Sequence, residues 1–378
     1  MNPETSNSIL LSDPKLLAAF YRDKLLGETL GFWFPRSIDT QFGGYLHCLD
    51  ADGTLVDSDK SVWAQGRMAW MLLTIHNSLN PDPQLVTWAQ SGLEFLWKYG
   101  FDSDDGRMYF HLTREGSPIR KRRYAYSESF AAIACAAKYR ATGESVWRER
   151  AVQMLDFFHD WNFTPGRMPA KFCGTRPTTG IGPRMIAITT AQSLRQDAGT
   201  DSKYQAWIDK LIDEIERLFV KHDHQAVLET VGEDGSILDH FDGRTLNPGH
   251  AIEAAWFIFD EACFQSDSRL VQLGCNILDY SLKRGWDEQF GGLFYFRDLY
   301  HRPVQEYWHD MKFWWPHNEA VIATLYAYLL TGKREYAVWH DKLHRWSFEH
   351  FEDKQHGEWF GYLHRDGSLS NTLKGGLW

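Results

Sequence analysis

The sequence predicts an all-α fold, a ring of six helix pairs or (α/α)6 toroid with short β-hairpins at one end. Two observations predict it. Turn segments of one type recur along the chain, and the stretches between them have the apolar spacing of amphipathic helices. Repetition on this scale is typical of folds built from copies of one supersecondary unit, which outweighs the expectation of several domains from length alone. We therefore expect one barrel domain over residues 1–378.

Four short segments carry the repeat, and each has a glycine after an acidic residue: ADGTL at 51–55, REGSP at 114–118, EDGSI at 233–237 and RDGSL at 365–369. The glycines lie 63, 119 and 132 residues apart, which is one, two and two steps of a unit of about 60–66 residues. The skipped steps fall near Cys173–Gly180 and Leu299–Pro303. The pattern predicts six hairpin turns, because glycine adopts the positive φ that such turns require.

Between these turns, the apolar periodicity predicts eleven helices, many with a glycine or proline stop signal. Two helices per unit require a twelfth. We expect it to begin after Trp378, so that the last inner helix is missing and the domain is C-terminally incomplete. In such a toroid the inner helices line a funnel and the hairpins surround its mouth. The expected helices cover about 13–30, 61–79, 83–99, 127–142, 145–161, 183–197, 202–221, 249–265, 268–284, 311–331 and 334–351.

Composition and charge exclude several classes of protein. The net charge is −10 and the longest basic run, Arg120–Arg123, is short, so we expect no nucleic-acid partner. No apolar stretch reaches the length of a membrane span, and the N-terminus does not look like a secretory signal. The five cysteines are scattered without metal or disulfide spacing, which fits a reduced, cytoplasmic protein.

The segment 247–253 (Asn-Pro-Gly-His-Ala-Ile-Glu) opens one expected helix and places His250 in its first turn. The partial positive charge of a helix N-terminus disfavours imidazolium, so we expect His250 to be neutral and able to accept a proton. Glu253, on the same helix face, acts in the opposite sense and can orient the ring. The alternatives are a histidine that satisfies a buried turn, or a metal ligand pair, which needs more ligands than these two.

Arg67 lies on the expected helix 61–79 between residues that have the pattern of a protein core. A buried arginine needs an anionic or oxygen-rich partner, which can be a carboxylate of the protein or an oxygen of a substrate.

The 17 tryptophans, several of them beside polar residues, fit either a large helical core or a sugar site with apolar ring faces beside hydrogen-bonding groups. The densest such segment is 312–319 (Lys-Phe-Trp-Trp-Pro-His-Asn-Glu), from which we expect substrate contacts by Lys312, Trp315, His317 and Glu319. Trp359 lies in a similar setting. Six other histidines near the later hairpins are expected at the surface or rim: His301, His309, His344, His350, His356 and His364.

No nucleotide-binding, dinucleotide-binding or nucleophile motif is present, so we expect chemistry without a cofactor or metal.

The chain resembles the N-acylglucosamine 2-epimerase family over nearly its whole length. The segments that carry this resemblance are 63–67, 247–254, 291–296, 312–319 and 357–363, continuing to 374–376.

The resemblance implies an (α/α)6 barrel, commonly a homodimer, that inverts C2 of a reducing sugar, with N-acetyl-D-glucosamine and N-acetyl-D-mannosamine as the first candidates. It implies that Arg67, His250, Glu253 and Glu319 line the pocket, and Trp63 is expected to bind substrate. His250 would be one of two catalytic histidines. In the family the second follows the Lys-Gly-Gly segment, in a stretch that this chain does not contain, and Thr189 stands where acylglucosamine epimerases usually have asparagine.

Inversion at C2 requires ring opening, removal of the C2 proton and return of a proton to the opposite face. Histidine suits both transfers because its ordinary pKa is about 6.5. Arg67 can stabilise the enediolate oxygen, and no redox group is needed because substrate and product have the same oxidation state.

Other functions remain open at this point. D-Glucose/D-mannose 2-epimerisation or mannose isomerisation would use the same enediolate. An (α/α)6 glycoside hydrolase would need a carboxylate pair, for which Glu253, Glu319 and Glu358 are candidates. A sugar-binding protein without catalysis is the third possibility.

Overall fold

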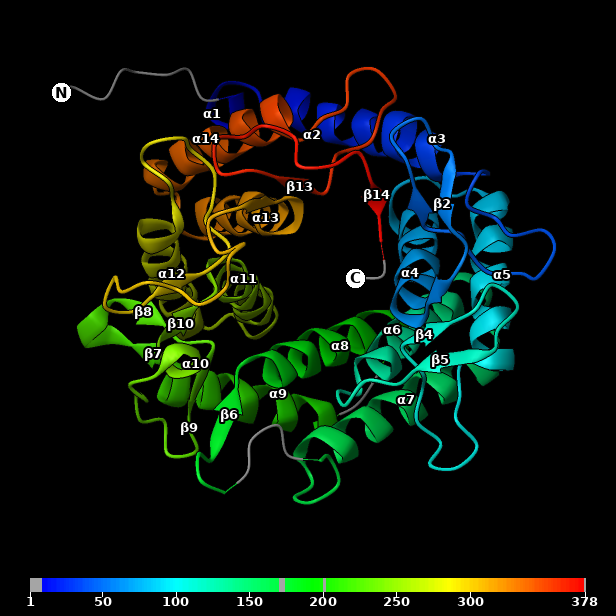
Figure 1. Cartoon of the computed structure of the whole chain (residues 1–378), viewed down its shortest axis with the longest axis horizontal. Coiled ribbons are helices and arrows are strands. Elements are labelled where there is room, and N and C mark those ends of the chain that lie inside the picture. Colours follow the sequence, from blue (N-terminus) through cyan, green and yellow to red (C-terminus); the bar gives the residue numbers. More distant parts are fainter. Residues whose placement is uncertain (1–8, 170–173, 200–201, 377–378) are drawn as a thin grey trace. The chain divides into compact units, whose positions relative to one another are not determined.

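The computed structural model describes residues 9–169, 174–199 and 202–376, and Figure 1 shows it as a cartoon. Cys173 lies outside the described residues. The chain divides into two compact units. Unit 1 comprises Met1–Phe32, Gly174–Met185 and Ile212–Thr372, and unit 2 comprises Trp33–Cys173, Ile186–Leu211 and Leu373–Trp378. The single domain expected over 1–378 stays a prediction.

The helices confirm the periodicity analysis. Each of the eleven expected ranges contains a helix in the described residues, with α2, η1 and α3 forming one continuous run and η2 extending α9. Two of these ranges are too long, because 220–221 and 312–313 are strand residues. The long helices are α2 (Pro14–Asp23) with η1 (Lys24–Thr29) and α3 (Leu30–Trp33), α4 (Val62–Ser78), α5 (Pro83–Tyr99), α6 (Tyr126–Thr142), α7 (Ser145–Phe163), α8 (Gly182–Ala198), α9 (Ser202–Glu214) with η2 (Ile215–Phe219), α11 (Pro248–Gln265), α12 (Ser268–Gly285), α13 (Trp314–Thr331) and α14 (Arg334–His350). Shorter helical pieces are α1 (Ile9–Ser12), η3 (His222–His224) and α10 (Phe241–Arg244).

The four repeated segments are tight turns, as predicted. Their glycines have φ values of 87°, 101°, 86° and 87° at Gly53, Gly116, Gly235 and Gly367, where a side chain would be strained. In three of them the preceding aspartate accepts the N–H of the residue after the glycine (Asp52 from Thr54, Asp234 from Ser236, Asp366 from Ser368). The expected hairpin at 233–237 is only partly correct, because the strand before this turn pairs with a distant strand.

Unit 1 combines two helix pairs with short antiparallel strand pairs. Helix α11 packs against α12 and α13, and α13 packs against α14. The strand pairs are β6 (Thr178–Gly180) with β9 (Thr230–Gly232), β7 (Val220–Lys221) with β8 (Ala226–Val227), β10 (Thr245–Leu246) with β11 (Arg297–Asp298), and β12 (Lys312–Phe313) with β13 (Tyr362–Leu363). Strand β12 runs directly into α13, so its pairing fixes where that helix begins.

Unit 2 has the same plan. Helix α4 packs against α5 and α6, and α6 packs against α7. Two three-stranded sheets accompany these helices: β14–β1–β2 from Lys374–Gly375, Cys48–Leu49 and Leu55–Asp57, and β3–β4–β5 from Lys60–Ser61, His111–Leu112 and Pro118–Arg120.

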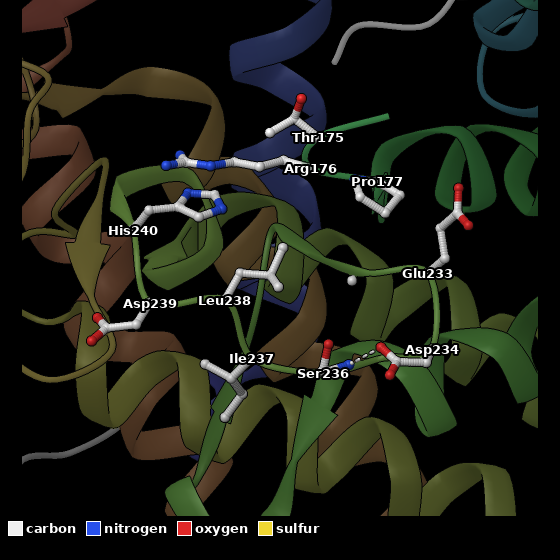
Figure 2. Close-up of a pocket in the computed structure, with 11 residues that line it drawn as sticks. Thr175, Arg176, Pro177, Glu233, Asp234, Ser236, Ile237, Leu238, Asp239 and His240 are labelled. Atoms are coloured by element: carbon white, nitrogen blue, oxygen red, sulfur yellow. Dashed lines mark hydrogen bonds between the residues drawn. The ribbon is translucent and has the colours of Figure 1, made fainter. Parts of the chain in front are cut away.

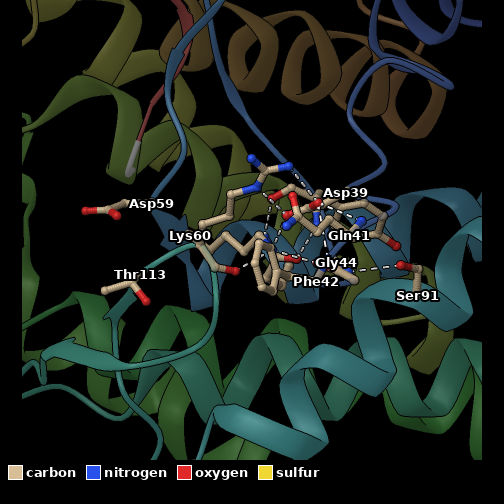
Figure 3. A network of polar contacts seen from close by, with 12 residues as sticks. Asp39, Gln41, Phe42, Gly44, Asp59, Lys60, Ser91 and Thr113 are labelled. Atoms are coloured by element: carbon tan, nitrogen blue, oxygen red, sulfur yellow. Dashed lines mark hydrogen bonds and ion pairs between the residues drawn. The ribbon is translucent and has the colours of Figure 1, made fainter.

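Each unit contains one buried aspartate held by a lysine and by the arginine of a repeated turn. In unit 2, Lys60 Nζ donates to Asp39 Oδ2 at 2.8 Å, and Arg114 Nε donates to the same oxygen at 2.9 Å; Figure 3 shows Lys60 and Asp39 pointing toward one another. In unit 1 the corresponding residues are Lys312, Asp287 and Arg365, with distances to Asp287 Oδ2 of 3.1 and 2.8 Å. These clusters tie the tip of a hairpin to a buried loop.

A buried histidine pair holds the N-terminal helix of unit 1. The hydroxyl of Tyr21 on α2 lies 2.9 Å from His344 Nδ1 and 3.3 Å from His340 Nε2, both on α14. His344 is only 7% exposed, so its expected surface position is wrong: it lies on the face of α14 that α2 covers. Burial lowers the pKa of His340 to about 4, and the neighbouring His344 acts in the same direction.

We expect the free energy of unfolding to fall as the pH is lowered from about 6.5 to about 4. The unfolded chain then binds a proton that native His340 excludes, which costs about 1.4 kcal/mol per pH unit for one such group. Urea unfolding across this range should therefore show a steeper pH dependence for the wild type than for H340Q. Equal slopes would contradict this assignment.

Candidate active site

The start of helix α11 places His250. Asn247 caps the helix, its Oδ1 accepting the backbone N–H of His250 at 3.2 Å, and Pro248 occupies the first turn. Gly249 is required here because a Cβ at this position would lie 2.6 Å from the ring of Trp315. The imidazole therefore projects from a fixed helix end with a tryptophan against it.

The His250 ring is held by a residue that sequence analysis did not identify. Its Nδ1 lies 3.0 and 3.1 Å from the two carboxylate oxygens of Glu229, so Nδ1 carries a proton and donates it to that group. Nδ1 also lies 3.1 Å from Nδ2 of Asn247, a contact that becomes a hydrogen bond only if Nδ1 is deprotonated. The His250 side chain is 35% exposed.

The charge of His250 differs from the expected neutral state. Burial lowers its pKa, but the charge and hydrogen bonds of Glu229, with the charges of Glu253 and Glu319, outweigh burial and raise the pKa to about 9. His250 is therefore imidazolium at neutral pH. The helix N-terminus does act against the positive ring, but its partial charge is smaller than that of the carboxylates around it.

Two further carboxylates belong to this region of unit 1. Glu253 follows His250 on α11, and Glu319 lies on α13, which packs against α11. Oε2 of Glu319 accepts the indole N–H of Trp256 at 2.6 Å, which fixes that side of the carboxylate. Both groups act on His250 through their charge. The structure therefore brings together His250, Glu253 and Glu319, all three of which were predicted from the sequence.

An aromatic wall adjoins the imidazole. The Trp315 ring lies 5.2 Å from the His250 ring at an interplanar angle of 34°. Tyr295 meets Trp315 edge-on at 6.0 Å and stacks on Phe313 at 4.0 Å. Burial raises the pKa of Tyr295, and the charge of Glu229 adds to this effect. A charged donor beside an indole face suits a ligand with polar edges and apolar C–H faces.

Lys312, His317 and Trp359, which were also predicted to contact the substrate, have structural partners. Lys312 is fully buried on Asp287, and His317 is fully buried with Nε2 accepting the N–H of Leu293 at 2.9 Å. The Trp359 ring stacks on Phe351 at 5.5 Å. These contacts hold the hairpins of unit 1 in place, so we do not propose substrate binding for Lys312 and His317.

Trp63 and Arg67 lie on α4 in unit 2. Arg67 is exposed, so the expectation that it is buried is wrong: Gly66 and Ala69 face the core, while Arg67 points to another side of the helix. Its guanidinium lies 5.1 Å from the ring centre of Phe130. Trp63 packs edge-on against Phe110 at 5.0 Å.

A separate cavity of about 530 Å³ lies in unit 1 between segments 175–177 and 232–240 (Figure 2). It contains none of the predicted site residues. Figure 2 shows the side chains of Arg176 and His240 on one side of it and Asp234 bonded to Ser236 on another.

Glu229 immediately precedes β9, the strand that leads into this cavity wall, and no motif in the sequence marks it. Its N–H donates to Thr245 O at 3.0 Å, and its carbonyl accepts the N–H of Ile181 at 3.1 Å. Strand pairing therefore brings it to His250.

In the described part of the chain, no group of three or more His, Cys, Asp or Glu residues is arranged to hold a metal. Of the helices described, none is both long and apolar enough to cross a membrane.

Comparison with solved structures defines the fold class first. The structure of cellobiose 2-epimerase from Bacillus thermoamylovorans matches with a TM-score of 0.83 at 20% identity, covering 96% of this chain and 95% of that one. A D-mannose isomerase structure matches with a TM-score of 0.79 at 18% identity, covering 99% and 95%. The predicted (α/α)6 barrel fold is thereby confirmed.

Sequence comparison then gives the family. The family model for N-acylglucosamine 2-epimerase matches residues 44–378. The N-acylglucosamine 2-epimerase of Bos taurus is 34% identical over 365 residues, covering 93% of this chain and 85% of that protein. The chain belongs to the N-acylglucosamine 2-epimerase family, as its motifs predicted.

Proposed function

We propose that this protein, a carbohydrate epimerase by its family, inverts C2 of a reducing sugar with His250 as a proton-transfer group. The observation that carries the proposal is the partly exposed imidazolium of His250, held by Glu229 and placed against the indole of Trp315. We propose N-acetyl-D-glucosamine and N-acetyl-D-mannosamine as its substrates, because the bovine relative named for acylglucosamine is 34% identical over most of both chains.

The geometry gives each ring nitrogen a separate task. Nδ1 is engaged by Glu229, so Nε2 is the atom through which His250 exchanges a proton with the sugar. In one direction the imidazolium donates a proton to C2 of the enediolate. In the other direction the neutral ring removes that proton from the product epimer. A second acid–base group must serve the opposite face, and one such group contributes about 10²–10⁴-fold in rate.

The surrounding groups suit the remaining demands of the reaction. Loss of the C2 proton creates negative charge, which the neighbouring imidazolium stabilises. The carboxylates of Glu253 and Glu319 can accept hydrogen bonds from sugar hydroxyls, and the face of Trp315 can pack against apolar C–H groups. This arrangement favours an epimerase over a glycoside hydrolase, which needs a carboxylate pair across the scissile bond, because here the imidazole lies among the carboxylates.

We expect deuterium from solvent D₂O to appear at C2 of N-acetyl-D-glucosamine and N-acetyl-D-mannosamine when either is incubated with the enzyme. Proton NMR would measure this exchange, with D-glucose, D-mannose and cellobiose as parallel substrates. Preferential exchange in D-glucose and D-mannose would replace the proposed substrate with the alternative of the same chemistry. The proposal of an epimerase is wrong if none of these sugars exchanges its C2 hydrogen.

Several expectations stay predictions. They are a catalytic role for Arg67, substrate contacts by Trp63 and Trp359, a homodimer and a cytoplasmic location. R67K, which keeps the charge and loses the planar fork, is the informative variant for the first of these.

A further inference from the structure

We propose that Glu229 is a positioning residue: its carboxylate fixes the His250 ring through Nδ1, and its negative charge keeps Nε2 protonated as well, so that His250 is the proton donor of the resting enzyme. The kinetic part of this inference rests on the proposed function, whereas the effect of Glu229 on the ring can be tested without any sugar.

The geometry of the contact supports a positioning role. Both carboxylate oxygens of Glu229 lie within 3.1 Å of Nδ1, so the ring is held from one side and Nε2 faces away from that carboxylate. The backbone of Glu229 is itself fixed, since its N–H and carbonyl pair with Thr245 and Ile181. The Glu229 side chain is 26% exposed, which limits its freedom to move away.

Three acidic groups act on the ring from three parts of unit 1. Glu229 comes from the segment before β9, Glu253 from α11 and Glu319 from α13. Tyr295, from the loop before β11, lies near the same carboxylate, since the charge of Glu229 raises its pKa. Glu229 bonds the ring directly, whereas Glu253 and Glu319 act through charge. Removal of the Glu229 charge should therefore lower the titration midpoint of the His250 ring more than removal of either other charge.

The consequence for the reaction is that His250 and the group on the opposite face of the sugar have different roles, acid and base. A ring that is already protonated cannot take the C2 proton in its resting state, so it delivers a proton to the enediolate. The group on the opposite face must then act as the base for the first step. When the substrate is the other epimer, the neutral form of His250 is required, and that form is rare at neutral pH because Glu229 stabilises the charge.

Two variants separate charge from geometry. E229Q keeps an oxygen that can accept the Nδ1 proton but removes the negative charge. E229D keeps the charge but withdraws it by one methylene. E233Q is the matched control, because Glu233 is an exposed glutamate in the turn that follows the same strand.

The first measurement is an NMR titration of the His250 imidazole in the protein without sugar, assigned by its loss in H250N. We expect the titration midpoint near 9 in the wild type and in E233Q. In E229Q we expect it to fall by about 1–3 pH units, the usual effect of removing an opposite charge at this distance. An unchanged midpoint in E229Q would overturn the proposal.

The second measurement is the pH profile of kcat/KM for the epimer toward which His250 acts as the acid. We expect the alkaline limb of E229Q to move to lower pH by the same interval as the NMR midpoint, with KM changing less than kcat, and E229D to restore part of the shift. A uniform loss of activity without movement of this limb would assign Glu229 a merely structural role. If the wild type epimerises no sugar, the proposed function fails, while the titration still decides whether Glu229 controls the ring.

Discussion

Replacement of His250 by asparagine is expected to reduce kcat for C2 epimerisation by about 10²–10⁴-fold, with little change in sugar affinity. Asparagine can still accept or donate a hydrogen bond but cannot transfer a proton at neutral pH. The Trp315 face and the carboxylates of Glu253 and Glu319 remain in place, so binding should survive. Steady-state kinetics would give the loss in kcat, and isothermal titration calorimetry would give Kd.

H356N is a suitable control, because His356 lies exposed in a turn of unit 1 and should leave both kcat and Kd unchanged. Retention of wild-type kcat in H250N would remove His250 from the reaction. A large rise in Kd with unchanged kcat would instead make it a binding residue. A wild type that binds the sugar but shows no C2 exchange would point to a sugar-binding protein without catalysis.

The sequence predicts the helices and turns well because these depend on local physics. Apolar spacing near 3.6 residues needs no knowledge of partners, and each of the eleven expected ranges contains a helix. Likewise, Gly53 and Gly367 mark their turns because only glycine adopts their φ of 87° without strain. The fold class follows from counting these local units.

The site was predicted only in part because its chemistry depends on long-range pairing. His250 and Glu253 could be found from one helix start, but Glu229 lies 21 residues before His250 and reaches it through strand pairing. The ring of His250 was therefore predicted to be neutral, whereas the carboxylates around it keep it protonated at neutral pH. The role of Lys312 could not be predicted for the same reason. Its place beside tryptophans is typical of a sugar contact, whereas in the structure its ammonium group binds the distant Asp287 in the core.

The largest loss of stability is expected from D287N. The charged groups of Asp287 and Lys312 are both almost completely buried, and Arg365 completes the cluster. Burial alone would raise the pKa of Asp287, but the hydrogen bonds of Arg365 and Lys312 outweigh it and lower the pKa to about 2. Asparagine would leave a buried ammonium group without its counter-charge, which costs about 3–5 kcal/mol. Urea unfolding followed by tryptophan fluorescence would measure the change.

The repeat of this cluster provides an internal test of the explanation. D39N removes the equivalent charge beside Lys60 and Arg114, so it should cost a similar amount in unit 2. E216Q breaks the exposed pair with Arg269 and should cost at most about 1 kcal/mol. Because the Asp287 pKa is depressed from 3.8 to about 2, its contribution is present above pH 4 and disappears as the pH falls through 2. The difference in unfolding free energy between D287N and the wild type should therefore shrink in that interval, because the wild-type carboxyl then becomes neutral too. A constant difference down to pH 2 would mean that the cost of D287N comes from packing.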